Sequence, residues 1–192
     1  MHAINRLGRL SMLFVAGLAL AGAQSPETPA APPAPSGPQE VEVMGVFVDP
    51  QAQQPVVVLQ GKRDHRSFAM VIGPAEATGI AVPLQKITPP RPLTHDLFLT
   101  LFGRLGVKVE KVVITDLRDN TFFAVIYLNA QGLNAQGLDA QGPNAPGPMQ
   151  LDSRPSDAIA LAVRAKAPVY VEDRVFDKAS QVPGALPPGS RI

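Results

Sequence analysis

The segment LDSRPSDAIALAVRAKAPVYVED, residues 151–173, restricts the fold more than any other part of this sequence. Pro155 favours the first turn of a helix, because the N–H group that proline lacks has no intrahelical partner at that position. Apolar residues continue to Lys166, and PVYVED then has the β-branched character of a strand. The segment therefore predicts a strand, a helix and a second strand in direct succession, so a sheet must accompany the helices.

Alternating, β-rich runs predict further strands, and proline and glycine mark where helices start and stop. Strands are expected at residues 41–49, 55–61, 67–73, 107–117, 121–128, 149–152 and 168–173. Helices are expected from Pro74, over 94–106 and over 155–166, with one brief helical turn at 175–181. We therefore expect an α+β fold, in which a mixed, mainly antiparallel sheet packs against about three short helices.

The helix at 94–106 has the clearest pattern of the three. Thr94 suits its N-cap, Asp96 its positive end, and Gly106 its termination. Its apolar residues form one stripe at helical spacing, made of Leu97, Phe98, Leu101, Phe102 and Leu105. The helix from Pro74 is weaker, because it contains Gly79 and Pro83.

The first 23 residues have the pattern of a secretory signal peptide. Arg6 and Arg9 precede an apolar run over 10–20, and Ala-Gly-Ala at 21–23 forms a cleavage site. The run is shorter than the roughly 20 residues that span a bilayer. We therefore expect export to the periplasm, cell envelope or exterior, with no stable membrane span after cleavage; an uncleaved N-terminal anchor is the alternative.

Proline and glycine also delimit the folded domain. Residues 24–39 contain six prolines and read as an extended linker. The domain is expected over 40–182, followed by a fraying tail at 183–192. Four tandem pentapeptides at 128–147, LNAQG-LNAQG-LDAQG-PNAPG, interrupt it. They predict a flexible loop insert between two strands, or alternatively a flap that contacts a ligand.

Composition excludes several kinds of site. The chain has no cysteine, so disulfides, thiolate metal sites and cysteine nucleophiles are impossible. Its formal charge is +1; removing residues 1–23 takes away Arg6 and Arg9 and no acid, which leaves 15 basic and 16 acidic residues, or −1. This is not the bulk charge of a protein that grips nucleic acid electrostatically. Any contact with a polyanion must be local.

Two segments of the chain resemble each other. GPAEATGIAV at 73–82 aligns without gaps on RPSDAIALAV at 154–163, which matches Pro74 with Pro155 and Glu76 with Asp157. A strand is expected just before each segment. The pattern suggests two related strand–helix units and a possible internal duplication.

The acids at these helix starts have two interpretations. Capping alone explains Glu76 or Asp157, because an acid in the first turn interacts favourably with the helix dipole. Arg154 indicates a phosphate-binding site, since a guanidinium beside the free N–H groups of a helix start could hold a phosphate. Arg91-Pro92 introduces a third helix start, where His95 could act as acid, base or ligand, or simply cap the helix.

The sequence contains few motifs of other enzyme classes or metal sites. The metalloprotease, P-loop, dinucleotide-binding and serine-hydrolase motifs are absent. Asp116 and Asp119 flank a hairpin turn, where carboxylates usually form turns, although a hard-cation site is the alternative. Two histidines remain after cleavage, too few for a three-histidine zinc centre. Any metal is therefore expected to be Mg²⁺ or Mn²⁺ in an oxygen-rich site.

PRPLTHDLF and DSRPSDAIALAVRAKAPVYVED together closely resemble the bifunctional nuclease family. VIGPAEATGIA is similar to that family's segment around its glutamate, and VVITDLRDNTFFAVIYL to its central hairpin. The resemblance runs in order over residues 41–179. It implies hydrolysis of phosphodiester bonds in DNA, RNA or both, and its motif positions here are Glu76, Arg91, His95, Asp96, Asp152, Arg154, Ser156 and Asp157.

On this resemblance we expect the helix starts at Pro74, Thr94 and Pro155 to meet at one rim. Glu76, Asp96 and Asp157 would hold a divalent cation that activates water. His95 would transfer a proton, which makes these four the expected catalytic set. Substrate would be bound by Arg91, Arg154 and Ser156, with Arg91 and Arg154 neutralising the phosphate.

Two other functions remain open. In the first, the same motifs are structural, and the domain is an exported binding or homo-oligomerising module without activity. The near-neutral charge of the chain, its small number of aromatic side chains (ten) and the absence of a nucleic-acid motif favour this alternative. In the second, the same residues act on small nucleotides.

Overall fold

The computed structural model describes residues 37–129 and 149–180. These residues belong to one compact unit. The expected signal peptide, most of the expected linker, the tail and nearly all of the pentapeptide repeat lie outside the described residues. The described helices are all too short or too polar to cross a membrane.

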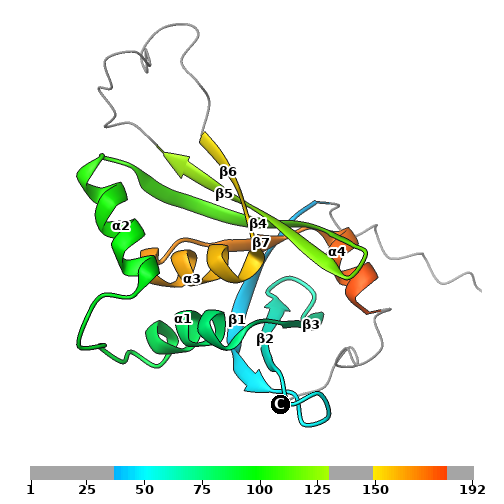
Figure 1. Ribbon diagram of the computed structural model, residues 1–192. Helices are drawn as coiled ribbons and strands as arrows, with labels where there is room; N and C mark the ends of the chain where they lie inside the picture. The colour runs from blue at the N-terminus through cyan, green and yellow to red at the C-terminus, as the bar shows by residue number, and fades with distance from the viewer. Residues whose placement is uncertain (1–36, 130–148, 181–192) are drawn as a thin grey trace, which may run out of the picture. The chain divides into compact units, whose positions relative to one another are not determined.

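Within the described residues, seven strands form one sheet, and four helices accompany them (Figure 1). The strands are β1 (Gln39–Val48), β2 (Pro55–Gly61), β3 (Ser67–Val71), β4 (Lys108–Arg118), β5 (Thr121–Asn129), β6 (Met149–Ser153) and β7 (Val169–Val171). The helices are α1 (Pro74–Leu84), α2 (Thr94–Arg104), α3 (Pro155–Ala165) and α4 (Asp173–Ala179). The expected α+β class is confirmed, with α4 a full helix where one brief turn was expected.

The sheet has the strand order β3-β2-β1-β7-β4-β5-β6. Every neighbouring pair is antiparallel except β4 and β7, so the expected mixed, mainly antiparallel sheet is confirmed. Strand β1 already includes Gln39, which was expected to end the linker and instead pairs with Val171. Leu128 and Asn129, expected in the repeat, are the last residues of β5.

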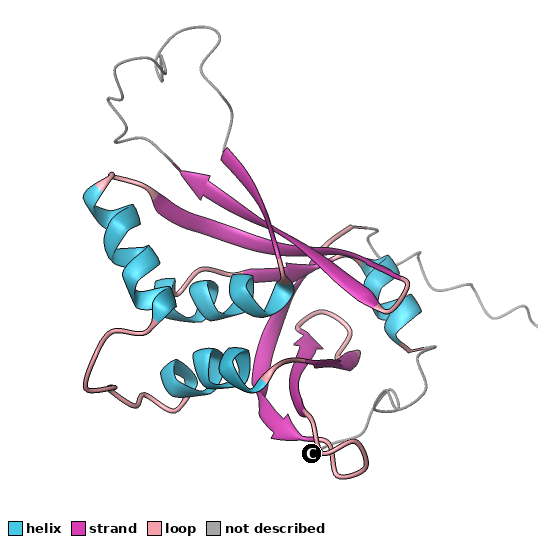
Figure 2. Ribbon diagram, viewed as in Figure 1, coloured by secondary structure: helices cyan, strands magenta, loops and turns pink. Residues whose placement is uncertain are grey.

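The sheet repeats one arrangement on either side of β7. Strands β1–β3 form an antiparallel meander followed by α1, and β4–β6 form a second meander followed by α3 (Figure 2). In the second meander the turn Asp119-Asn120 has φ of 49° and 58°. Positive φ at both central residues is typical of a type I′ hairpin turn, so Asp119 forms a turn as expected.

The core lies between the sheet and the helices α1 and α3. Residues Ala158–Ala162 of α3 are all buried, and Ile159 packs with Ile114 and Ile126 of the sheet in one apolar cluster. Burying one such side chain contributes about 1.5–3 kcal/mol. This packing fixes α3, and therefore Arg154 and Asp157 at its start, against the sheet.

Candidate active site

The N-termini of α1 and α3 meet, and they are equivalent in the two halves of the fold. Each helix starts with proline and carries an acid two residues later, Glu76 in α1 and Asp157 in α3. The residue before the proline differs: it is Gly73 in the first half and Arg154 in the second. One arginine is therefore available to two equivalent acids.

Arg154 bridges these two acids. Its Nε donates to Asp157 Oδ2 at 2.7 Å, and one terminal nitrogen lies 3.0 Å from Glu76 Oε1. The hydrogen bond and charge of Asp157, with Glu76 beside it, raise the pKa of Arg154 above its ordinary value. Because the arginine side chain is 66% exposed, the bridge adds little to stability, and the guanidinium is free to meet a ligand.

His95 completes the group from α2. Its Nε2 lies 3.4 Å from Asp157 Oδ1, although the two residues are 62 positions apart in sequence. The contact is a hydrogen bond when the imidazole carries a proton on Nε2, because an ionised carboxylate only accepts. Because the His95 side chain is only 14% exposed, the pair is shielded from bulk water on most sides. The expected meeting of the three helix starts is thus observed.

Gly79 makes room for His95. A Cβ atom at this position would lie 3.0 Å from His95 Cε1 and 3.8 Å from Ala160 Cβ. Gly79 was expected only to weaken α1, yet its missing side chain also leaves room for the histidine ring.

Arg164 holds the three helices together. Its guanidinium pairs with Asp96 of α2 at 2.8 Å and donates to the carbonyl oxygens of Gly79 and Ala160. The arginine side chain is 6% exposed. Because these contacts reach α1, α2 and α3 at once, Arg164 fixes the position of α2 and, with it, of His95.

The same contacts explain how α2 is turned. The expected cap, Thr94, is instead the first helical residue, and Asp96 caps the helix by accepting a hydrogen bond from the Leu93 N–H at 2.8 Å. His95, Leu99 and Phe102 lie at helical spacing, and the latter two pack against the core. Most of the predicted apolar stripe therefore stays exposed, namely Leu97, Phe98, Leu101 and Leu105. Gly106 has φ of 69°, so it ends the helix as expected.

A cleft of about 690 Å³ opens where these helices meet β6. Its polar residues are Glu76, Thr78, Thr94, His95, Asp152, Ser153, Arg154 and Asp157. Its other lining residues are Ala75, Gly79, Leu93, Phe98, Phe102, Ile126, Leu151 and Leu161. Three carboxylates face one arginine, so the cleft carries an excess of two negative charges when His95 is neutral.

The donor atoms of the cleft suit Mg²⁺ or Mn²⁺, because carboxylate oxygens are their preferred ligands. Among residues 37–129 and 149–180, however, no three histidine, aspartate or glutamate side chains gather closely enough to hold an ion. Arg154 instead takes the place between Glu76 and Asp157. The side chains as arranged do not form a metal centre.

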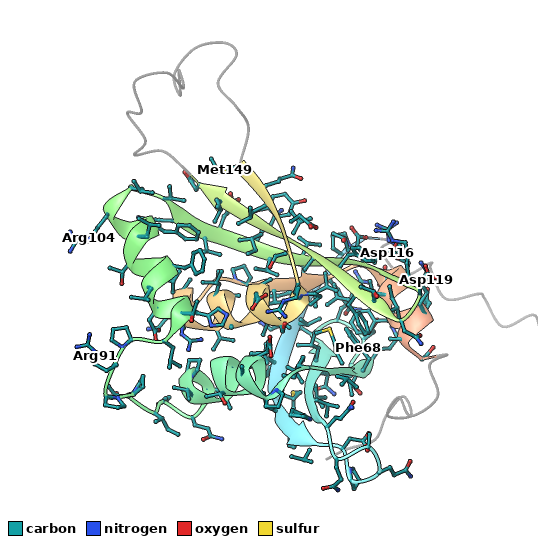
Figure 3. All side chains as sticks on the ribbon, in the orientation of Figure 1. Phe68, Arg91, Arg104, Asp116, Asp119 and Met149 are labelled. Atoms are coloured by element: carbon teal, nitrogen blue, oxygen red, sulfur yellow. The ribbon has the colours of Figure 1, made fainter. Side chains whose placement is uncertain are left out.

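Three other candidates lie apart from this group. Both carboxylate oxygens of Asp96 are used by Leu93 and Arg164, so this acid faces the helix junction rather than the cleft. Ser156 is buried and does not line the cleft. Arg91 is exposed in the loop before α2, and its side chain points away from the helices (Figure 3).

Asp116, the alternative cation ligand, pairs with Lys178 of α4 at 2.7 Å. Figure 3 shows Asp116 and Asp119 at the hairpin end of β4 and β5, near α4 rather than the candidate site. Asp116 thus ties α4 to the sheet.

Adding a side chain at Gly79 is expected to push the ring of His95 away from Asp157. In Gly79→Ala the new methyl group would lie 3.0 Å from Cε1 and 3.2 Å from Nδ1 of His95, inside ordinary carbon contact distance. We expect the NMR ring signals of His95 to shift, while those of His65, in an exposed turn, stay in place. Unchanged His95 signals would show that the glycine is not needed for the contact.

Asp96 predicts a dependence of stability on pH. Burial alone would raise its pKa, but the hydrogen bonds from the Leu93 N–H and from Arg164 outweigh burial and hold the pKa of Asp96 below its ordinary value of 3.8. A depressed folded-state pKa stabilises the fold above the unfolded-state value, and this stabilisation is lost as the pH falls through the folded-state value.

The difference in melting temperature between the protein and Asp96→Asn is therefore expected to be constant near neutral pH. It should shrink only below about pH 4, where the unfolded chain binds the proton. Thermal unfolding of both proteins between pH 7 and pH 3 measures this difference. A difference that grows as the pH falls would contradict the assigned contacts.

Comparison with known proteins identifies relatives of most of the domain. The family model described as "Bifunctional nuclease domain" matches residues 57–183, which include all the side chains of the cleft. An uncharacterized protein of Mycobacterium tuberculosis is 35% identical over 140 residues, which are 73% of this chain and 75% of that protein.

Plant relatives match a shorter stretch. Bifunctional nuclease 1 of Oryza sativa subsp. japonica is 30% identical over 92 residues, or 48% of this chain and 24% of the rice protein. The bifunctional nuclease of Oryza minuta gives the same values. The present chain therefore matches about a quarter of these plant proteins.

Proposed function

Since the chain belongs to the bifunctional nuclease domain family, we propose that it hydrolyses phosphodiester bonds of DNA, RNA or both in the cleft between α1, α2 and α3. One observation carries this proposal: an exposed arginine at a helix N-terminus, shared by two acids, stands beside a histidine–aspartate pair. A phosphate binds naturally at such a place, because the guanidinium and the helix N-terminus both attract negative charge.

The residues of this chain divide the work as follows. Arg154 exchanges its contacts with Asp157 for a phosphate oxygen and neutralises charge that develops on the phosphorus oxygens. Asp157 accepts the proton of the attacking water, whose oxygen forms the new bond to phosphorus. In its imidazolium form, His95 donates the proton on Nε2 to the oxygen of the bond that breaks and is left as neutral imidazole. Glu76 holds the guanidinium from the other side.

A divalent cation stays a prediction for this site. The excess of two negative charges in the cleft would repel a phosphate diester, and Mg²⁺ or Mn²⁺ would offset that excess. The steps given for Arg154, Asp157 and His95 do not depend on it. Metal dependence is therefore a separate arm of the test.

The test is cleavage of single-stranded DNA and RNA by the purified protein, with Mg²⁺, with Mn²⁺ and with EDTA. The control is the double variant His95→Ala/Asp157→Ala, checked for folding by circular dichroism. We expect cleavage by the natural sequence alone. Equal cleavage by both proteins, or absence of cleavage under every condition, would contradict the proposal. Cleavage that persists in EDTA would show that no metal ion is needed, and the proposed roles of Arg154, Asp157 and His95 would stand.

A structural role is the alternative, and one observation favours it. The charges of the motifs pair with one another: Arg154 with Glu76 and Asp157, and Asp96 with Arg164. In this alternative the domain binds a partner or a second copy of itself. It predicts that Asp157→Ala lowers the melting temperature, whereas the nuclease proposal predicts lost cleavage with the fold intact.

Two further proposals concern where the protein acts and on what. Residues 1–23 support export, which Edman sequencing of the mature protein from the producing cells would test: a first residue of Gln24 is expected. Cleavage of small nucleotides rather than polymers remains the alternative substrate class. It is tested by comparing a dinucleotide with a longer strand in the same assay.

A further inference from the structure

The aromatic side of the cleft has no role in the chemistry described so far. Phe98 lies on α2 and lines the cleft, yet its side chain is 48% exposed. Its ring centroid is 6.2 Å from that of Phe102, the next aromatic residue on the helix, which packs against the core. The two rings are inclined by 57° and both line the cleft, so α2 presents an aromatic surface there, with Phe98 its exposed part.

Strand β6 and the start of α3 contribute both apolar and charged side chains to the cleft. Leu151 lines the cleft while 45% exposed, and Arg154 follows it three residues later at the start of α3. Phe98, Leu151 and Arg154 line the same cleft. A nucleotide could place its base against the apolar side chains and its phosphate against the guanidinium. The volume of about 690 Å³ is in the range of sites for small ligands.

Building on the proposed function, we propose that Phe98 is a stacking platform for an unpaired nucleobase next to the phosphate held by Arg154, and that the site therefore takes single-stranded nucleic acid. The face of a base in a duplex is covered by its neighbours in the stack, so the ring cannot reach it without unstacking the helix. An unpaired strand offers its bases freely, whatever their sequence.

The consequence for substrate choice is measurable with three substrates of equal length. They are a single-stranded oligonucleotide, the same strand with abasic sugars, and its duplex. Stacking of one base contributes about 1–3 kcal/mol, which corresponds to a preference of about 5- to 150-fold for the base-bearing single strand in kcat/KM. The abasic strand keeps every phosphate, so the preference isolates the base.

Two variants on the same helix separate stacking from apolar contact. Phe98→Leu keeps an apolar side chain and removes the ring, and we expect it to lose the preference for bases through a higher KM. Leu101→Ala is the matched control, because Leu101 is 50% exposed on α2 but does not line the cleft. The control is expected to keep the preference. Equal cleavage of base-bearing and abasic strands by the natural sequence, or an unchanged preference in Phe98→Leu, would overturn the inference.

Binding of a 2-aminopurine oligonucleotide gives a readout that needs no cleavage. Stacking quenches the fluorescence of this base, and we expect quenching by the natural sequence and by Leu101→Ala but not by Phe98→Leu. If quenching follows this pattern and no strand is cut, the proposed hydrolysis fails while the base site stands. If strands are cut and quenching does not depend on Phe98, the base site fails while the hydrolysis stands. If neither occurs, both proposals are overturned.

Discussion

Replacing Arg164 with alanine is expected to lower the free energy of unfolding by about 2–4 kcal/mol. Removing one partner of a buried ion pair costs about 3–5 kcal/mol, because the other charge is left without compensation. The lower range applies here since Asp96 keeps 34% of its side chain exposed, while Arg164 is 6% exposed. The carbonyl oxygens of Gly79 and Ala160 lose their donor as well. Chemical denaturation with urea measures the change.

Arg164→Lys and Arg104→Ala are the matched variants for this prediction. A lysine keeps the charge but cannot reach three acceptors with one fixed fork, so an intermediate loss is expected. Arg104 is exposed at the end of α2, and its side chain points away from the sheet in Figure 3, so its removal should change little. A loss below about 1 kcal/mol in Arg164→Ala would mean that α2 is held by packing alone.

Replacing Arg154 with alanine is expected to produce the opposite pattern, with lost activity and preserved stability. Removing a group that stabilises developing charge typically lowers kcat by about 10²–10³-fold. The Arg154 side chain is 66% exposed, so the ion pairs that it loses contribute at most about 1 kcal/mol to stability. Kinetics of phosphodiester cleavage and a melting curve for the same sample test both halves of the prediction.

The control for Arg154→Ala is again Arg104→Ala, which removes the same charge from an exposed position outside the cleft. Loss of activity in both variants would point to general electrostatic attraction of the substrate. A fall in melting temperature with unchanged cleavage in Arg154→Ala would assign the arginine to the fold.

Local patterns were enough to predict most of the fold. Alternating residues and hairpin turns located the strands, and the prolines at 74 and 155 marked two helix starts correctly. The internal similarity between 73–82 and 154–163 also predicted that Glu76 and Asp157 occupy equivalent places, and these acids do share one arginine. These features depend on residues that are close in sequence, so they can be predicted from a single sequence.

The rotation of α2 could not be predicted in this way. Its strongest apolar stripe suggested that Leu97 and Leu101 face the core, yet both are exposed. The structure instead packs Leu99 and Phe102 against the core and pairs Asp96 with Arg164, 68 residues apart. Helical periodicity shows which residues share a face of a helix. It does not show which face will be buried when a residue distant in sequence makes the contact.

The helix α3 did contain a signal for Arg164. This residue lies seven positions after Asp157, hence on the same face two turns later, among residues that are otherwise apolar. A charge on a buried face calls for a buried partner. Nothing in the sequence around Arg91 indicated that it would lie apart from the cleft. It became a candidate through its motif, and the structure shows it exposed in the loop before α2.

The central claim is that Arg154, Asp157, His95 and Glu76 form a site for chemistry and not merely a pair of capped helices. The most direct measurement compares the protein with Asp157→Ala in one assay, recording cleavage of a single-stranded oligonucleotide and the melting temperature together. We expect cleavage to fall by about 10²–10⁴-fold, since a group that takes up a proton is lost, while the melting temperature changes little. Unchanged or absent cleavage in both proteins, with a clearly lower melting temperature for Asp157→Ala, would contradict the claim and assign these residues to the stability of the fold.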